Sequence, residues 1–144
     1  MTRFSTQNMN FDTKIAIVVA EDLAIWQKLN VTAFLTSGIV GTTEGIIGEP
    51  YKDGSQRAYL PLCIQPIIVL KTSRGRLQTI LNRANSQEVA AAIYIEDMFA
   101  TGHDAANRAT VTNYPSGTLP LVGLAVRGEK KLIDKIVKGA KLHD

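Results

Sequence analysis

Cysteine is nearly absent from this 144-residue sequence, and long apolar runs are absent. Its one cysteine, Cys63, cannot form an intramolecular disulfide, which favours a reducing compartment such as the cytoplasm. No apolar run approaches the roughly 18 residues of a membrane span. The opening segment MTRFSTQNMNFDTK has no apolar core of the kind found in secretory signals. We therefore expect a cytoplasmic protein with no membrane partner.

Self-sufficient catalytic and cofactor motifs are also missing. There is no G-x-S-x-G nucleophile elbow. The glycines between Gly38 and Gly48 follow an expected helix rather than a strand, and their spacing matches neither the Rossmann nor the P-loop pattern. His103 and His143 are the only histidines, and with scattered carboxylates they are too few for a zinc site. We expect neither a cofactor nor a metal ion.

The bulk composition is that of an ordinary globular protein. Hydrophobic residues make up 45% of the chain and charged residues 20%, and the length favours one domain. The formal net charge of +3 is mildly basic, which is compatible with a polyanionic partner without indicating one.

Alternating strand and helix signals predict an α/β fold. Runs of β-branched apolar residues predict buried strands, and apolar residues at helical spacing predict amphipathic helices. The strands are expected at 14–20, 66–71, 89–95 and 119–127, and the helices at 23–37, 73–84, 103–111 and 129–140. This order predicts a three-layer α/β/α sandwich with a sheet of about four strands, in a single domain over residues 14–144. Residues 1–13 are expected to be a flexible N-terminal arm.

The segment between the first helix and the second strand predicts a hairpin insertion. Glu44–Tyr51 is expected to pair with Arg57–Ile64 across the turn KDGS, because Asp-Gly favours a tight turn.

The helix expected at 23–37 is apolar on nearly all sides. Such a helix is typical of one that is covered on several sides, here by the sheet and by a partner chain. Its apolar residues are Ile25, Trp26, Leu29, Val31, Ala33, Phe34 and Leu35.

The chemistry-bearing residues gather after the third strand, in EDMFATGHD. Ligands of open α/β sheets bind at the carboxyl ends of strands, so this is the candidate site. Asp97 and Thr101 lie four residues apart, and the carboxylate can orient the hydroxyl or a water for attack on an ester. The alternative is that both only cap the local backbone. His103 is either a general acid or base or a residue that caps the following helix.

Three further polar residues lie near the start of the first helix. If the first and third strands are parallel neighbours, Asp22, Lys28 and Asn30 face Asp97 and Thr101. The alternatives are that Asp22 caps the helix and that Asn30 is a hydrogen-bonded buried amide. Lys28 and Asn30 point roughly 160° apart on a helix, so both cannot aim at one spot.

A line of lysines lies along the outer face of the helix expected at 129–140. Lys131, Lys135 and Lys138 are placed to meet phosphate groups, or they form a solvated face, since no aromatic residue is interleaved to stack bases.

Several segments of the chain resemble an uncharacterised bacterial domain family that shares its fold with type II peptidyl-tRNA hydrolases. They are EDL at 21–23, GEPYKDG at 48–54, EDMFATGHDAANR at 96–108 and LVGLAVRGEKKLIDKIVKGAKLH at 121–143, together with Asn30. The resemblance to the hydrolases rests on Asp22-Leu23 after a strand, on the D-x-x-x-T spacing of Asp97 and Thr101, and on the last strand and helix. It implies a mixed four-stranded sheet, a homodimer, and hydrolysis of the ester that joins a peptide to tRNA.

The resemblance also assigns roles to the candidate residues. Asp97 would orient a water or Thr101, Lys28 would stabilise developing negative charge, and His103 would be an auxiliary acid or base. The substrate would be bound by Asp22, Asn30, Lys131, Lys135 and Lys138. The chain differs from the hydrolases at Trp26 and Phe99, which replace glycines, and Lys28 is out of register with their catalytic lysine.

Two other functions use the same fold. One is a non-catalytic homodimeric module that binds a small molecule or a protein, favoured by the apolar helix around Trp26 and Phe34. The other is aminoacyl-tRNA editing or another acyl-transfer reaction at the same site.

Overall fold

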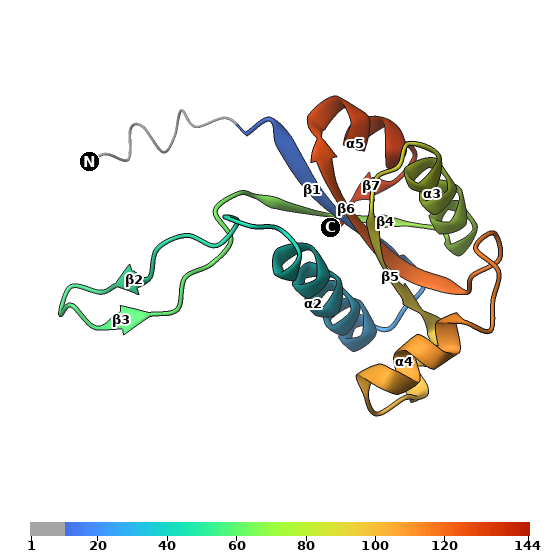
Figure 1. Cartoon of the computed structure of the whole chain (residues 1–144), viewed down its shortest axis with the longest axis horizontal. Coiled ribbons are helices and arrows are strands. Elements are labelled where there is room, and N and C mark those ends of the chain that lie inside the picture. The colour runs from blue at the N-terminus through green and yellow to red at the C-terminus, as the bar shows by residue number, and fades with distance from the viewer. Residues whose placement is uncertain (1–10) are drawn as a thin grey trace.

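A mixed five-stranded sheet and four helices make up the body of the protein (Figure 1). The computed structural model describes residues 11–144. The strands are β1 (Thr13–Ala20), β4 (Ile67–Thr72), β5 (Ala91–Ile95), β6 (Leu121–Glu129) and β7 (Lys141–Leu142), with β2 (Tyr51–Lys52) and β3 (Ala58–Tyr59) in a separate hairpin. The helices are α2 (Ile25–Gly41), α3 (Arg74–Ser86), α4 (Asp104–Val111) and α5 (Lys130–Ile136), and η1 (Glu96–Ala100) is a 3-10 segment. The mixed α/β fold predicted from the sequence is confirmed.

The strand order is β5-β6-β1-β4-β7, which corrects two expectations. The sheet has five strands rather than about four, because α5 ends at Ile136 and Gly139, at φ +100°, turns the chain back to form β7 beside β4. β5 does not neighbour β1, because β6 lies between them and is antiparallel to both. β1 and β4 are parallel neighbours.

The helices cover the two faces of the sheet. Gly123 and Gly128 lie on opposite faces of β6 because they are five residues apart along a strand. Gly123 contacts α2 and Gly128 contacts α5, so these two helices pack on opposite faces. α3 contacts α5 and shares its face (Figure 1). Residues Ile15 to Ala20 of β1 are fully buried between these layers and form the centre of the core.

The helix α2 is buried on one side only. Val31, Leu35 and Ile39 face the sheet, whereas Ile25 is 76% and Trp26 61% exposed. Within residues 11–144, the apolar outer face is therefore largely uncovered, although Trp26 packs at its margin against Phe99 and Phe34 against Tyr94. None of the helices in this part of the chain is long and apolar enough to cross a membrane.

The hairpin insertion is shorter than predicted. Only Tyr51–Tyr59 and Lys52–Ala58 pair in β2 and β3, with one further bridge between Ile47 and Cys63. Pro50 and Pro61 lack the N–H groups that a longer ladder requires. Figure 1 shows the hairpin reaching away from the body of the molecule. Of the predicted arm, residues 1–10 lie outside the described part, and Thr13 already belongs to β1.

Candidate functional site

The carboxyl ends of β1, β4 and β5 meet at one edge of the sheet. β1 and β4 are parallel, and β1 and β5 are both antiparallel to β6, so all three point the same way. Glu21, Ser73 and Glu96 are the first residues after these strands. Ligands of open α/β sheets bind at this edge, so it stays the candidate site that the sequence predicts.

Arg74 connects the loops that follow β1 and β5. Its Nε donates to Asp22 Oδ1 at 3.0 Å, and its Nη1 donates to Glu96 Oε2. The hydrogen bond to Asp22 is the main reason that the pKa of Arg74 is raised. Asp22 does not cap α2. The N-cap is Ala24, whose N–H donates to the Gln27 side chain at 3.0 Å. Arg74 therefore holds one oxygen of Asp22, and the role of Asp22 in substrate binding stays a prediction.

Asp97 is fixed by a tyrosine that the sequence analysis did not select. The Tyr114 hydroxyl donates to Asp97 Oδ2 at 2.9 Å, and this hydrogen bond raises the pKa of Tyr114. The second oxygen, Oδ1, accepts no side-chain hydrogen bond within residues 11–144. Asp97 thus carries one fixed and one available oxygen at the end of β5.

Thr101 and His103 take part in local contacts. The Thr101 hydroxyl lies 3.0 Å from the carbonyl oxygen of Met98 and also contacts Asn107 Oδ1. His103 Nδ1 accepts the N–H of Ala106 at 3.2 Å and so caps α4. These are the capping roles that the sequence left open as alternatives. Asp97, Thr101 and His103 lie on η1 and at the start of α4, and the side chain of each bonds to a different partner.

Lys28 is not part of this cluster. The ring of Trp26 packs against Phe99 of η1 with centroids 5.9 Å apart, so the Trp26 side of α2 faces η1. Lys28, two residues later, lies on the other side of the helix. Asn30 is exposed rather than a buried amide. The predicted meeting of Lys28 with Asp97 required β1 and β5 to be neighbours, and β6 separates them.

The predicted lysine line is solvent-exposed. Lys131 and Lys135 lie on α5, and Lys138 lies beyond its end. The carbonyl oxygen of Lys138 accepts a hydrogen bond from Arg83 Nη1 at 2.8 Å, which ties this turn to α3.

The α2–β4 groove is a cavity of about 700 Å³ on the far side of α2 from η1. Lys28 and Thr32 line it from the helix, and His143 and Asp144 line it from the segment after β7. His143 Nε2 is a buried nitrogen with no hydrogen-bond partner in the described part of the chain. The apolar walls are formed by Val19, Ile25, Leu29, Ile67, Ile68, Val69 and Leu142.

No group of three or more histidine, cysteine, aspartate or glutamate side chains in residues 11–144 is arranged to hold a metal ion.

Comparison with known families gives one match over nearly the whole described chain. The profile of a family described as protein of unknown function (DUF2000) matches residues 13–144. The chain belongs to the DUF2000 family. This confirms the resemblance to an uncharacterised domain family, while the relationship to type II peptidyl-tRNA hydrolases stays a prediction.

A solved structure shows the same fold as this DUF2000 chain. It is that of a protein of unknown function from Agrobacterium tumefaciens, 54% identical in sequence, with a TM-score of 0.92. The match covers 94% of the present chain and all of the other. No curated protein matches the chain.

Sequence reasoning on this DUF2000 chain missed three functional candidates. Arg74 and Tyr114 are separated in sequence from the carboxylates that they hold, so local spacing carried no signal for either. The sequence gives no sign that His143 lies near the first helix. Only the pairing of β7 with β4 brings it beside α2.

Proposed function

We propose that this DUF2000 chain is a non-catalytic binding module for a small molecule with an apolar body, a hydroxyl and a carboxylate, held in the α2–β4 groove. The observation that carries the proposal is the buried, unpartnered Nε2 of His143 in a groove with apolar walls. A buried polar atom without a partner is costly, and a ligand that bonds to it removes that cost.

The size and lining of the groove fit such a ligand. Its volume of about 700 Å³ falls within the range of small-molecule sites, which are mostly apolar with a few placed polar groups. The apolar walls would take a hydrocarbon chain or ring.

Two polar groups would orient the ligand. The Lys28 ammonium makes no ion pair within residues 11–144 and is the partner for a carboxylate. His143 Nδ1 lies 3.2 Å from the carbonyl oxygen of Asp144. When Nδ1 carries the proton and donates to that oxygen, Nε2 is left as an acceptor for a ligand hydroxyl.

Titration of the isotope-labelled protein with octanoate and with octanol, followed by NMR chemical shifts, tests this proposal. We expect saturable shifts at Val69 and His143 for both probes. Lys28→Gln should weaken octanoate binding about tenfold and leave octanol binding unchanged, because only octanoate carries the charge. Lys131→Gln is the matched control on α5. Absent shifts, or an equal effect of both lysine variants, would contradict the proposal.

We also propose that the module is a homodimer that packs through the outer face of α2. This face exposes Ile25, Trp26 and Phe34, and Lys28 is the only charged residue of the helix. Contiguous exposed apolar surface of this kind is typical of an interaction site.

A second candidate function is hydrolysis of the ester of an N-acylated aminoacyl-tRNA. The available Oδ1 of Asp97, beside an Oδ2 fixed by Tyr114, favours it, because such a carboxylate can accept the proton of an attacking water. His103 would assist and the lysines of α5 would bind phosphate. Single-turnover release of tRNA by the wild type that Asp97→Asn abolishes would support hydrolysis. If neither protein releases tRNA, hydrolysis is excluded and the binding module remains the proposed function.

A further inference from the structure

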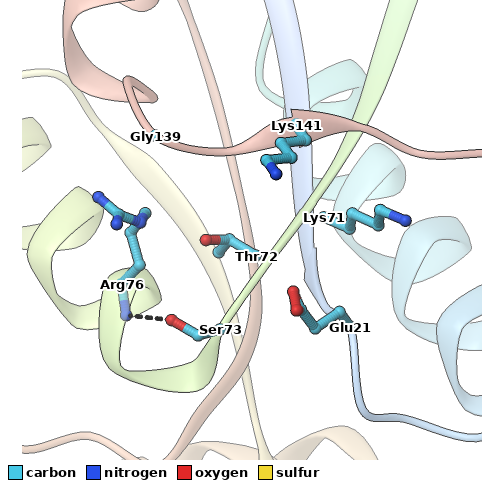
Figure 2. A pocket seen from close by; sticks show the side chains of 7 residues that line it. All are labelled: Glu21, Lys71, Thr72, Ser73, Arg76, Gly139 and Lys141. Carbon is cyan, nitrogen blue, oxygen red and sulfur yellow. Dashed lines mark hydrogen bonds between the residues drawn. The ribbon is translucent and has the colours of Figure 1, made fainter.

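We propose that the pocket between the ends of β4 and β7 and the start of α3, here called the basic pocket, binds the phosphate group of a small phosphate ester. It is a cavity of about 350 Å³ on the same edge of the sheet as the candidate site. Figure 2 shows it with its lining residues, Glu21, Lys71, Thr72, Ser73, Arg76, Gly139 and Lys141. The proposed site is separate from the α2–β4 groove, and nothing in the proposed function depends on it.

Three cationic residues line the basic pocket from three elements, and Figure 2 shows the Lys71 side chain pointing away from Arg76. Lys71 comes from β4, Arg76 from α3 and Lys141 from β7. Lys71 forms an ion pair with Asp144 at 2.5 Å, and the hydrogen bond to Asp144 raises its pKa. Arg76 and Lys141 form no ion pair within residues 11–144, so their charge is available to an anion.

Two of these lysines stand opposite each other in the sheet. Lys71 and Lys141 are direct partners in the antiparallel pairing of β4 with β7. Like charges directly opposite each other on neighbouring strands are destabilising. Asp144 already balances the charge of Lys71, so Lys141 is the lysine of this pair whose charge a bound anion would balance.

The hydroxyl of Thr72 supplies the second, independent observation. Thr72 is only 5% exposed and makes no side-chain hydrogen bond with any residue from 11 to 144. Figure 2 shows its oxygen on the side of the pocket where Arg76 lies. Its oxygen is not among the buried unpartnered atoms of residues 11–144, so it is accessible from the basic pocket, where a phosphate oxygen would be its partner.

The first turn of α3 adds backbone donors. The helix has 13 residues, and Ser73 caps it by accepting the N–H of Arg76 at 3.3 Å. The free N–H groups of the first turn carry partial positive charge and favour an anion at this end. Gly139 allows the guanidinium of Arg76 to lie against the backbone, because a Cβ at this position would overlap it.

Glu21 is the one carboxylate that lines the basic pocket. It lies at the end of β1, where its N–H donates to the carbonyl oxygen of Thr72 at 2.9 Å. Its charge opposes that of a bound anion, while its oxygens can accept a hydrogen bond from a hydroxyl of the same ligand. The pocket should therefore prefer a phosphate ester that carries a hydroxyl over inorganic phosphate.

Calorimetric titration with inorganic phosphate and with glycerol 3-phosphate, at one low ionic strength, tests this inference. We expect saturable binding of both, with glycerol 3-phosphate the tighter. Arg76→Gln and Lys141→Gln should each weaken binding at least tenfold, and Thr72→Val a few-fold. Glu21→Ala should tighten inorganic phosphate and remove the preference for the ester, because it removes both the negative charge and the hydrogen-bond acceptor.

Lys52→Gln on the β2–β3 hairpin is the matched control and should change nothing, because Lys52 is exposed and does not line the basic pocket. Lys141 is exposed at a sheet edge, so its variant keeps the test decisive if Arg76→Gln does not fold. An absence of saturable binding by the wild type, or equal losses in Lys141→Gln and Lys52→Gln, would overturn the inference. Equal affinity for the two probes in the wild type would overturn the role given to Glu21.

Discussion

Gly123 of β6 lies directly against Val31 of α2. A Cβ at Gly123 would come within 2.6 Å of Val31 Cγ1, and within 3.0 Å of Leu35 Cδ1. The absence of a side chain at this position sets how closely α2 approaches the sheet, and so fixes the helix that lines the α2–β4 groove.

Gly123→Ala should therefore lower the free energy of unfolding by about 1–3 kcal/mol through overpacking. Gly117→Ala is the control, because a Cβ there would meet no atom within 4 Å. Urea denaturation of both variants measures the difference. Equal stability of the two would show that α2 shifts without cost.

Replacing Arg74 should loosen the loops after β1 and β5. Arg74→Gln removes ion pairs to both Asp22 and Glu96, which are half-exposed, so we expect a loss of about 1 kcal/mol. Arg108→Gln breaks one exposed i,i+4 pair with Asp104 and should cost about 0.3–0.5 kcal/mol. Thermal unfolding compares them, and hydrogen exchange should rise at Asp22 and Glu96 only in Arg74→Gln. Unchanged exchange would contradict the bridging role.

The contact between Tyr114 and Asp97 predicts a change in tyrosine ionisation. The pKa of Tyr114 is raised above its usual value of 10.0, first by the hydrogen bond to Asp97. The folded state therefore holds this proton more tightly than the unfolded state. The resulting stability is complete below about pH 10 and is lost as pH rises through the folded pKa.

Asp97→Asn should shift the ionisation of Tyr114 to lower pH, because the carboxylate that opposes the phenolate is gone. Ultraviolet absorbance during an alkaline titration follows this shift. Tyr114→Phe identifies the transition, since it should remove the affected tyrosine from the curve. An Asp97→Asn curve identical to that of the wild type would show that the hydrogen bond does not form in solution.

The outer face of α2 predicts the oligomeric state. Trp26→Glu places a charge on the exposed apolar face and should convert the proposed dimer to a monomer in sedimentation experiments. Lys131→Glu on α5 makes an equally charged change elsewhere and should leave the dimer intact. A wild type that sediments as a monomer at all concentrations would exclude this interface.

The sequence was sufficient for elements whose pattern is local. β1, β4 and β6 carry continuous apolar runs, and α3 has a serine cap with a clear apolar face, so all four were predicted within a few residues. β7 was missed because a strand of two residues has no period to detect. The order of the strands could not be predicted either, because no local pattern indicates that β6 lies between β1 and β5.

The candidate site was predictable in part for the same reason. Asp97, Thr101 and His103 adjoin one another in sequence, so their shared location followed from the end of β5. The partners that define their state are Tyr114 and Asn107, and no spacing rule connected them in advance. The basic pocket draws on β4, α3 and β7, which only the folded sheet brings together.

The position of β6 also links the candidate site to the core. β5 pairs with β6 and with no other strand among the described residues, and β6 follows it in the sequence. β5 therefore has no direct contact with β1 through the sheet, and its register relative to the centre of the core is set through residues 121–129. A change that shifts β6 should move Asp97 and the contacts of β1 together, so the candidate site and the core share one structural support.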